Sequence, residues 1–155
     1  MPGPCRLVFI AAASAGVLAF AAAGACAEGI APGLWRIASR TVTGGVMGPP
    51  HVSSRCFNPA QAKDVVATFV PAAGTDSSSC LPAEHALHGS KLRWRLVCRG
   101  ETAMEQSGEF IFESAHHYRA KIWTRAVVSG ATMVDSQDLI EGQWLSECHQ
   151  GLGRR

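Results

Sequence analysis

The sequence has almost no excess of charge of either sign. Its 155 residues carry 14 lysines and arginines against 12 aspartates and glutamates, a formal net charge of +2. A general nucleic-acid binder needs a strongly basic surface, so we exclude that class of partner. The composition is 47% hydrophobic and 17% charged, which is typical of a folded chain and not of a disordered one. A chain of this length can build one core, so we expect a single domain.

The chain also lacks the short motifs of common catalytic and metal sites. It contains no Gly-x-Ser-x-Gly elbow, no Cys-x-x-Cys pair and no His-Glu-x-x-His helix. His85 and His88 are three residues apart, but a zinc site needs further ligands around one point. We therefore predict no catalytic residue, no metal and no cofactor, and we expect that the protein is not an enzyme.

One long apolar run stands at the start of the chain. Residues 7–23 are apolar or small, and they lead to the small-x-small ending Ala25-Cys26-Ala27. This pattern predicts a signal peptide over residues 1–27 and a periplasmic or secreted protein. The run is short and has no basic stop, so we expect no transmembrane segment after cleavage. Gly24-Ala25-Cys26 leaves open a second reading, in which Cys26 carries a lipid anchor.

Four cysteines follow the predicted signal, namely Cys56, Cys80, Cys98 and Cys148. An even number of widely spaced cysteines in an oxidising compartment predicts two disulfides, with three possible connectivities. Cys80 and Cys98 are equidistant from Gly89, so a hairpin that turns there would place them face to face. We therefore expect Cys80 to pair with Cys98, which leaves Cys56 for Cys148. The strand before Gly89 should be irregular, because its apolar and polar positions do not fit that register throughout.

The second half of the chain alternates with a period of two. Even positions are apolar in three successive runs, and the charged odd positions are basic, then acidic, then basic. This predicts an antiparallel meander with one apolar face and one face of cross-strand ion pairs. Turns at Gly100 and near His116 would oppose Lys91 to Glu109, Arg95 to Glu105, and Arg119 to Glu113.

The remaining chain predicts further short elements. We expect strands over 35–42 and 52–57 and one short helix from Asn58 to Phe69. We also expect a weakly patterned strand over 131–140 and a last one over 143–148. The fold class is therefore all-β, with a single domain over 28–150 and a loose tail over 151–155. We expect a curved antiparallel sheet of seven or eight strands, either open or partly closed into a barrel.

Six aromatic residues should share the apolar face of this sheet: Trp35, Trp94, Phe110, Phe112, Tyr118 and Trp144. They would either face a ligand or fill the core of a small β-domain, and we favour the core. Trp123 has the opposite parity, so it should point outward, where it would contact a partner or lie under the N-terminal strand or the helix.

An ordered set of motifs resembles a known family. The set comprises Pro32-Gly33-Leu34-Trp35, Cys56 with Asn58-Pro59, Cys80, Trp94-x-x-x-Cys98-x-Gly100, Gly108 with Tyr118, and Gly142 with Cys148. In this respect the chain resembles the bacterial family catalogued as domain of unknown function 3617, whose members are small exported proteins. The resemblance implies a periplasmic location and four paired cysteines, but it brings no known activity and no catalytic residues.

These observations favour a non-catalytic exported protein that acts as a binding or envelope-associated module. A first alternative is a lipocalin-like carrier that encloses an apolar small molecule inside a curled sheet. A second is an envelope hydrolase, for which Asp135 or Asp138 could pair with Glu141 as two carboxylates. The sequence identifies neither a ligand nor a partner.

Overall fold

The computed structural model describes residues 29–72, 79–100, 102–128 and 130–148. The predicted signal peptide over 1–27, including the possible anchor at Cys26, lies outside the described residues. The predicted tail over 151–155 lies outside them as well.

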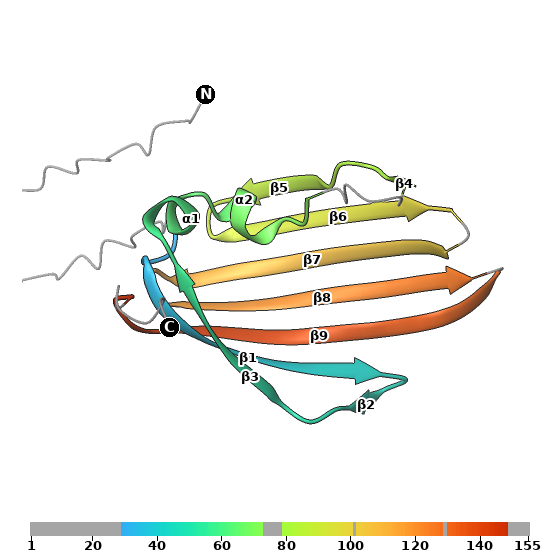
Figure 1. Cartoon of the computed structure of the whole chain (residues 1–155), viewed down its shortest axis with the longest axis horizontal. Coiled ribbons are helices and arrows are strands. Elements are labelled where there is room, and N and C mark those ends of the chain that lie inside the picture. The colour runs from blue at the N-terminus through green and yellow to red at the C-terminus, as the bar shows by residue number, and fades with distance from the viewer. Residues whose placement is uncertain (1–28, 73–78, 101, 129, 149–155) are drawn as a thin grey trace, which may run out of the picture.

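The described chain forms one antiparallel sheet and two short helices (Figure 1). The elements are β1 (Gly33–Thr43), β2 (Val46–Met47), β3 (His51–Phe57), α1 (Pro59–Lys63), α2 (Val65–Phe69), β4 (Ser79–Cys80), β5 (Glu84–His88), β6 (Lys91–Arg99), β7 (Thr102–Ser114), β8 (His117–Val128) and β9 (Ala131–Ser146). The strand order is β2-β1-β9-β8-β7-β6-β4, with β3 paired to β1 and β5 paired to β6. The all-β prediction is confirmed. The sheet is open and not closed into a barrel, and it has nine strands where seven or eight were expected.

The predicted helix after Asn58 is present but divided into two. Asn58 caps α1, because its side chain accepts a hydrogen bond from the Gln61 backbone at 2.9 Å and the Gln61 side chain accepts one from the Asn58 backbone at 3.0 Å. Asp64 has a non-helical backbone, with φ −103° and ψ 82°, so α1 ends there. Its carboxylate then accepts a bond from the Ala67 backbone at 2.9 Å and starts α2. The expectation of one helix was therefore wrong, because a capping residue stands at its centre.

The three predicted central strands are confirmed as β6, β7 and β8, but both registers differ from the expectation. Arg93 lies opposite Glu109 and Arg119 lies opposite Ile111, each a shift of two residues from the prediction. An even shift preserves which side chains share a face, so the alternation was predicted correctly. The expected ion pairs form diagonally: Arg95 to Glu105 at 2.7 Å, Lys91 to Glu109 at 3.8 Å, and Arg119 with Glu113 beside a bulge in β7.

The hairpin around Gly89 contains the irregularity that the sequence predicted. Cys80 lies opposite Cys98, but from Glu84 onward the pairing moves by one residue, so that Glu84 faces Arg95. The chain makes this change over residues 81–83, between β4 and β5.

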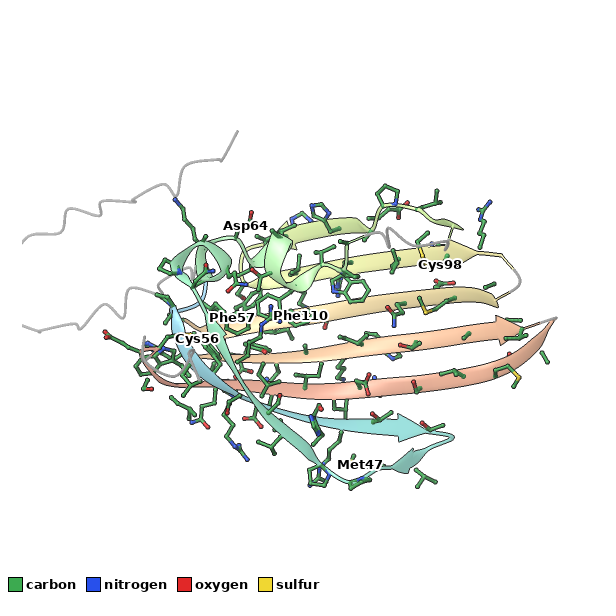
Figure 2. The ribbon with its side chains drawn as sticks, viewed as in Figure 1. Met47, Cys56, Phe57, Asp64, Cys98 and Phe110 are labelled. Carbon is green, nitrogen blue, oxygen red and sulfur yellow. A yellow bond between two sulfur atoms is a disulfide. The ribbon has the colours of Figure 1, made fainter. Side chains whose placement is uncertain are left out.

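The structure contains the two expected disulfides. Cys80 is joined to Cys98, and Cys56 is joined to Cys148. Figure 2 shows Cys56 at the end of the sheet that carries the helices and Cys98 near the opposite end. The two bridges therefore constrain different parts of the sheet.

The C-terminal part of the sheet differs from the prediction. β9 is one continuous strand from Ala131 to Ser146, not two segments. A register irregularity between Ala126 and Val127 of β8 changes its pairing with the start of β9. The sequence pattern is blurred there because polar Asp138 shares a face with Ile122, whereas apolar Leu139 shares the face of Lys121.

The core lies between the helices and one face of the sheet, which we call the covered face. Side chains of Trp35, Phe57, Leu92, Trp94, Phe110, Phe112 and Tyr118 are buried there, together with Ala62 and Val65 from the helices. Phe69 of α2 packs its ring 4.9 to 5.6 Å from the rings of Phe57, Phe110, Phe112 and Tyr118. Phe57 and Phe110 lie beside the helices in Figure 2. The opposite side of the sheet, which we call the open face, carries the charged residues of β6, β7 and β8.

Candidate functional site

A groove of about 720 Å³ lies on the open face. Strand pairing aligns its lining residues in two neighbouring cross-strand rows. One row runs through Ile111, Arg119, Glu141, Ala38 and Val52, and the other runs through Glu109, Lys121, Leu139 and Arg40. Twisted sheets are saddle-shaped, so each face is hollowed along one diagonal. The groove therefore spans five strands, from β7 through β8, β9 and β1 to β3.

The groove has an apolar floor and charged walls. The apolar side chains are those of Ala38, Pro50, Val52, Ile111 and Leu139. Four cationic residues, Arg36, Arg40, Arg119 and Lys121, stand around them with two carboxylates, Glu109 and Glu141. An apolar surface with a few convergent charges is typical of a small-molecule site.

Both carboxylates of the groove are engaged by cations. Glu109 accepts a bond from Arg93 Nε at 2.7 Å, and Lys91 Nζ lies 3.8 Å from the same oxygen. The hydrogen bond from Arg93 lowers the pKa of Glu109, so this carboxylate is ionised at neutral pH. Glu141 lies 2.9 Å from Nε2 of His117. That hydrogen bond raises the pKa of His117, which favours its charged form.

Three cations of the groove have no acidic partner among the described residues. In the part of the chain that the structure describes, no ion pair includes Arg36, Arg40 or Lys121. Arg40 Nη1 donates a hydrogen bond to the Met47 sulfur at 3.4 Å. Lys121 interacts with Glu109 only through longer-range electrostatic attraction, without an ion-pair contact. The groove is therefore positive overall, and an anionic group would complement it.

The aromatic residues singled out from the sequence lie elsewhere. Trp35, Trp94, Phe110, Phe112 and Tyr118 are packed into the core on the covered face, and Trp144 is half-buried at its margin. Burial raises the pKa of Tyr118 to about 12. Trp123 points to the open face, is 41% exposed and is covered by neither of the two helices. It stands in the cross-strand row next to Lys121.

The titratable residues considered for catalysis or metal binding are dispersed. Along β5, neighbouring side chains point to opposite faces, so His85 faces the side of Trp94 while Glu84 and His88 face the other. Among the residues that the structure describes, no three His, Cys, Asp or Glu side chains are grouped closely enough to hold a metal ion.

The carboxylates of β9 are likewise divided between the two faces. Asp138 accepts a bond from the Thr41 hydroxyl at 2.5 Å on the covered side, whereas Glu141 stands on the open face. The sheet itself therefore separates these two carboxylates.

The groove was not predicted from the sequence, but one signal could have pointed to it. Ile111 is an apolar residue at an odd position, between Glu109 and Glu113, on the face predicted to be charged. Leu139 also has odd parity, but the register of its strand could not be inferred. Ile111 of β7 and Leu139 of β9 line one groove because β8 lies between their strands, and this strand order could not be inferred from the sequence.

Comparisons with known proteins identify a family for this chain. No helix in the described ranges has the length and apolar character needed to cross a bilayer. No curated protein and no solved structure matches the chain. The model of the family described as "Protein of unknown function (DUF3617)" matches residues 30–148, from just before β1 to the last disulfide cysteine. The chain therefore belongs to the DUF3617 family.

Proposed function

We propose that the protein is an exported, non-catalytic binding module whose ligand occupies the groove on the open face. The observation that carries this proposal is the apolar floor at Leu139 and Ala38 beside cations that have no acidic partner in the described chain. The floor strands β7, β8, β9 and β1 each have a paired neighbour on both sides. Such a platform is rigid, so its side chains are held in place before a ligand arrives.

The ionised state of Glu109 fits a site that binds its ligand without reacting with it. A general acid at neutral pH needs a raised carboxyl pKa, but Arg93 lowers that of Glu109. A lipocalin-like carrier would hold its ligand inside a closed barrel. Here the sheet is open and the aromatic face is packed against helices, so the open face is the better candidate surface.

Export is supported by the apolar leader and by two disulfides, which persist in oxidising compartments. We propose a periplasmic or secreted location with the mature chain starting at Glu28. Mass spectrometry of protein recovered from its host tests this point. The expected mass is that of an oxidised chain from Glu28. A lipid-modified N-terminus at Cys26 would show an anchored protein instead, and an uncleaved chain with free thiols would contradict export.

Binding in the groove is tested by native mass spectrometry of protein purified from the host envelope. We expect a bound compound on the wild-type chain and its loss from Leu139→Glu, which places a charge on the groove floor. Gln137→Glu adds the same charge to β9 at an open-face position outside the groove and should retain the compound. Equal retention by both variants, or a wild-type chain that carries nothing, would contradict the proposal.

A further inference from the structure

We infer that the groove binds a single-chain anionic amphiphile, a molecule in which one acidic head is attached to an alkyl chain. This inference rests on the proposed function and specifies its ligand class. It is argued from the position of the cations, the chemistry of the floor, and the hydrogen-bonding state of the strands beneath it.

The cations converge on one part of the floor. Lys121, Leu139 and Arg40 are successive members of one cross-strand row, on β8, β9 and β1. Neighbouring strands lie about 4.8 Å apart, so the two cationic backbones are separated by roughly 10 Å with Leu139 between them. Both side chains are long and flexible enough to reach across Leu139 toward a shared anion. Their methylene stems would then extend the apolar surface below it.

The neighbouring row offers apolar side chains at both of its ends, with Arg119 and Glu141 between them. Ala38 and Val52 are cross-strand partners on β1 and β3, and Pro50 precedes β3 at the same wall. Ile111 supplies the apolar surface at the opposite end, on β7. A chain of methylene groups gains free energy by covering such a surface, at about 25 cal/mol for each Å² buried. The acidic head alone would leave this part of the groove unused.

The strands beneath the groove favour an alkyl chain over an acidic peptide. A bound peptide must satisfy its own backbone donors and acceptors, which it commonly does at a free strand edge. β7, β8, β9 and β1 present no free edge beneath the cations, because each is paired on both sides. Among the described strands, β3 has its unpaired edge beyond Val52, at the far end of the groove. An alkyl chain needs no such partners.

The net charge of the groove selects an acidic head over a neutral one. Arg36, Arg40 and Lys121 lack ion-pair partners within the described ranges, and the charges of Glu109 and Glu141 are already met by Arg93 and His117. An acidic head would form charge-assisted hydrogen bonds with these free cations. A neutral head would gain no such attraction.

The test is a titration of the full mature protein with dodecanoate, dodecanol, dodecyl maltoside and acetate, in which the three dodecyl probes are kept below their micellar or solubility limits. Binding is followed by calorimetry. It is also followed by quenching with 11-bromoundecanoate, because Trp123 is exposed beside the groove whereas Trp35 and Trp94 are buried on the other face. We expect dodecanoate to bind at least 10-fold more tightly than either neutral probe. We also expect that Trp123→Phe removes most of the quenching.

The cation pair is tested by the double variant Arg40→Gln/Lys121→Gln. Its dodecanoate affinity should fall by about 10-fold for each cation removed, which is a loss of about 1.4 kcal/mol for each charge-assisted hydrogen bond. Arg125→Gln is the matched control, because it removes a cation from the same face of β8 outside the groove. It should leave the affinity unchanged. All these positions are exposed, and circular dichroism checks that each variant folds.

Several results would overturn the inference. Dodecyl maltoside that binds as tightly as dodecanoate would remove the role of the acidic head, and acetate that binds equally well would remove that of the chain. These two comparisons use the wild-type protein, so they hold even if the double variant fails to fold. If a glutamate-rich peptide shifts the NMR signals of Ala38 and Leu139 while dodecanoate does not, the ligand class is wrong although the groove remains a binding site. If no compound of an envelope extract shifts those signals, the proposed function fails as well.

Discussion

The ring of Tyr118 lies directly over the α-carbon of Gly142, its cross-strand partner on β9. Trp94 lies in the same way over Gly108, its partner on β7. Near the start of β1, the indole of Trp144 occupies the space beside Gly33. Three glycines of the family-like motif therefore share one role, since each leaves room for an aromatic ring to lie flat on the strand. Core packing therefore explains these three glycine positions of the motif.

Gly142→Ala should destabilise the protein by about 1 to 3 kcal/mol, the usual cost of an overpacked core. An added β-carbon would lie closer to the Tyr118 ring than real β-carbons approach their neighbours. Urea unfolding measures the loss. In a Tyr118→Leu background the flat ring is absent, so the same glycine substitution should cost much less. An equal loss in both backgrounds would show that the ring and the glycine are not coupled.

The two disulfides should contribute unequally to stability. Cys56 and Cys148 are 92 residues apart, whereas Cys80 and Cys98 are 18 apart. In the chain-entropy model the longer loop contributes about 4.6 kcal/mol and the shorter about 3.2 kcal/mol. Replacing both cysteines of a pair by serine should therefore lower the free energy of unfolding more for Cys56 and Cys148, as measured by denaturant titration. The reverse order would show that native-state effects outweigh loop length.

His117 should make stability depend on pH in a defined direction. Its imidazole lies 2.7 Å from Glu113 and 2.9 Å from Glu141, and as a cation it donates to both. The bond to Glu141 is the main cause of its raised pKa, with Glu113 adding to it. A histidine whose pKa is raised in the folded state stabilises the protein at pH values below its unfolded-state pKa of about 6.5. This contribution is lost as the pH rises through the folded-state pKa. The hydrogen bonds from Arg119 and His117 lower the pKa of Glu113, which keeps this carboxylate ionised in that window.

We therefore expect the melting temperature of the wild type to exceed that of His117→Gln by more at pH 6 than at pH 9. NMR titration of the His117 ring gives its pKa directly, and Glu141→Gln should lower that pKa. A difference in melting temperature that is constant from pH 6 to pH 9 would contradict a charged bridge between β7, β8 and β9.

Most of the fold could be predicted because its central strands alternate without interruption. The parity of Leu92, Trp94 and Phe110 identified the core face even though both predicted registers were wrong by two residues. The division of the helix at Asp64 could not be predicted, because a single aspartate inside an otherwise helical run does not show whether it caps a new helix. The number of strands was underestimated because β2 and β4 have only two residues each and leave no periodic signal.

The candidate site could not be predicted for a physical reason. Its residues come from five strands, and two of them, Leu139 and Ala38, lie on strands that pair with each other across about a hundred residues of sequence. Alternation identifies the face of a strand, but it does not identify the neighbour of that strand. The sequence pointed to the aromatic residues because they are the largest apolar side chains, and large apolar side chains are the ones that the core buries.

The most direct test of the account is methyl NMR of the labelled protein with the compound that copurifies from the host envelope. Ala38, Ile111 and Leu139 report on the groove, while Leu92 and Leu96 report on the core of the covered face. The account predicts shifts at the three groove methyls and none at the two core leucines. Shifts confined to Leu92 and Leu96 would place the ligand on the aromatic face and contradict the assignment of the groove.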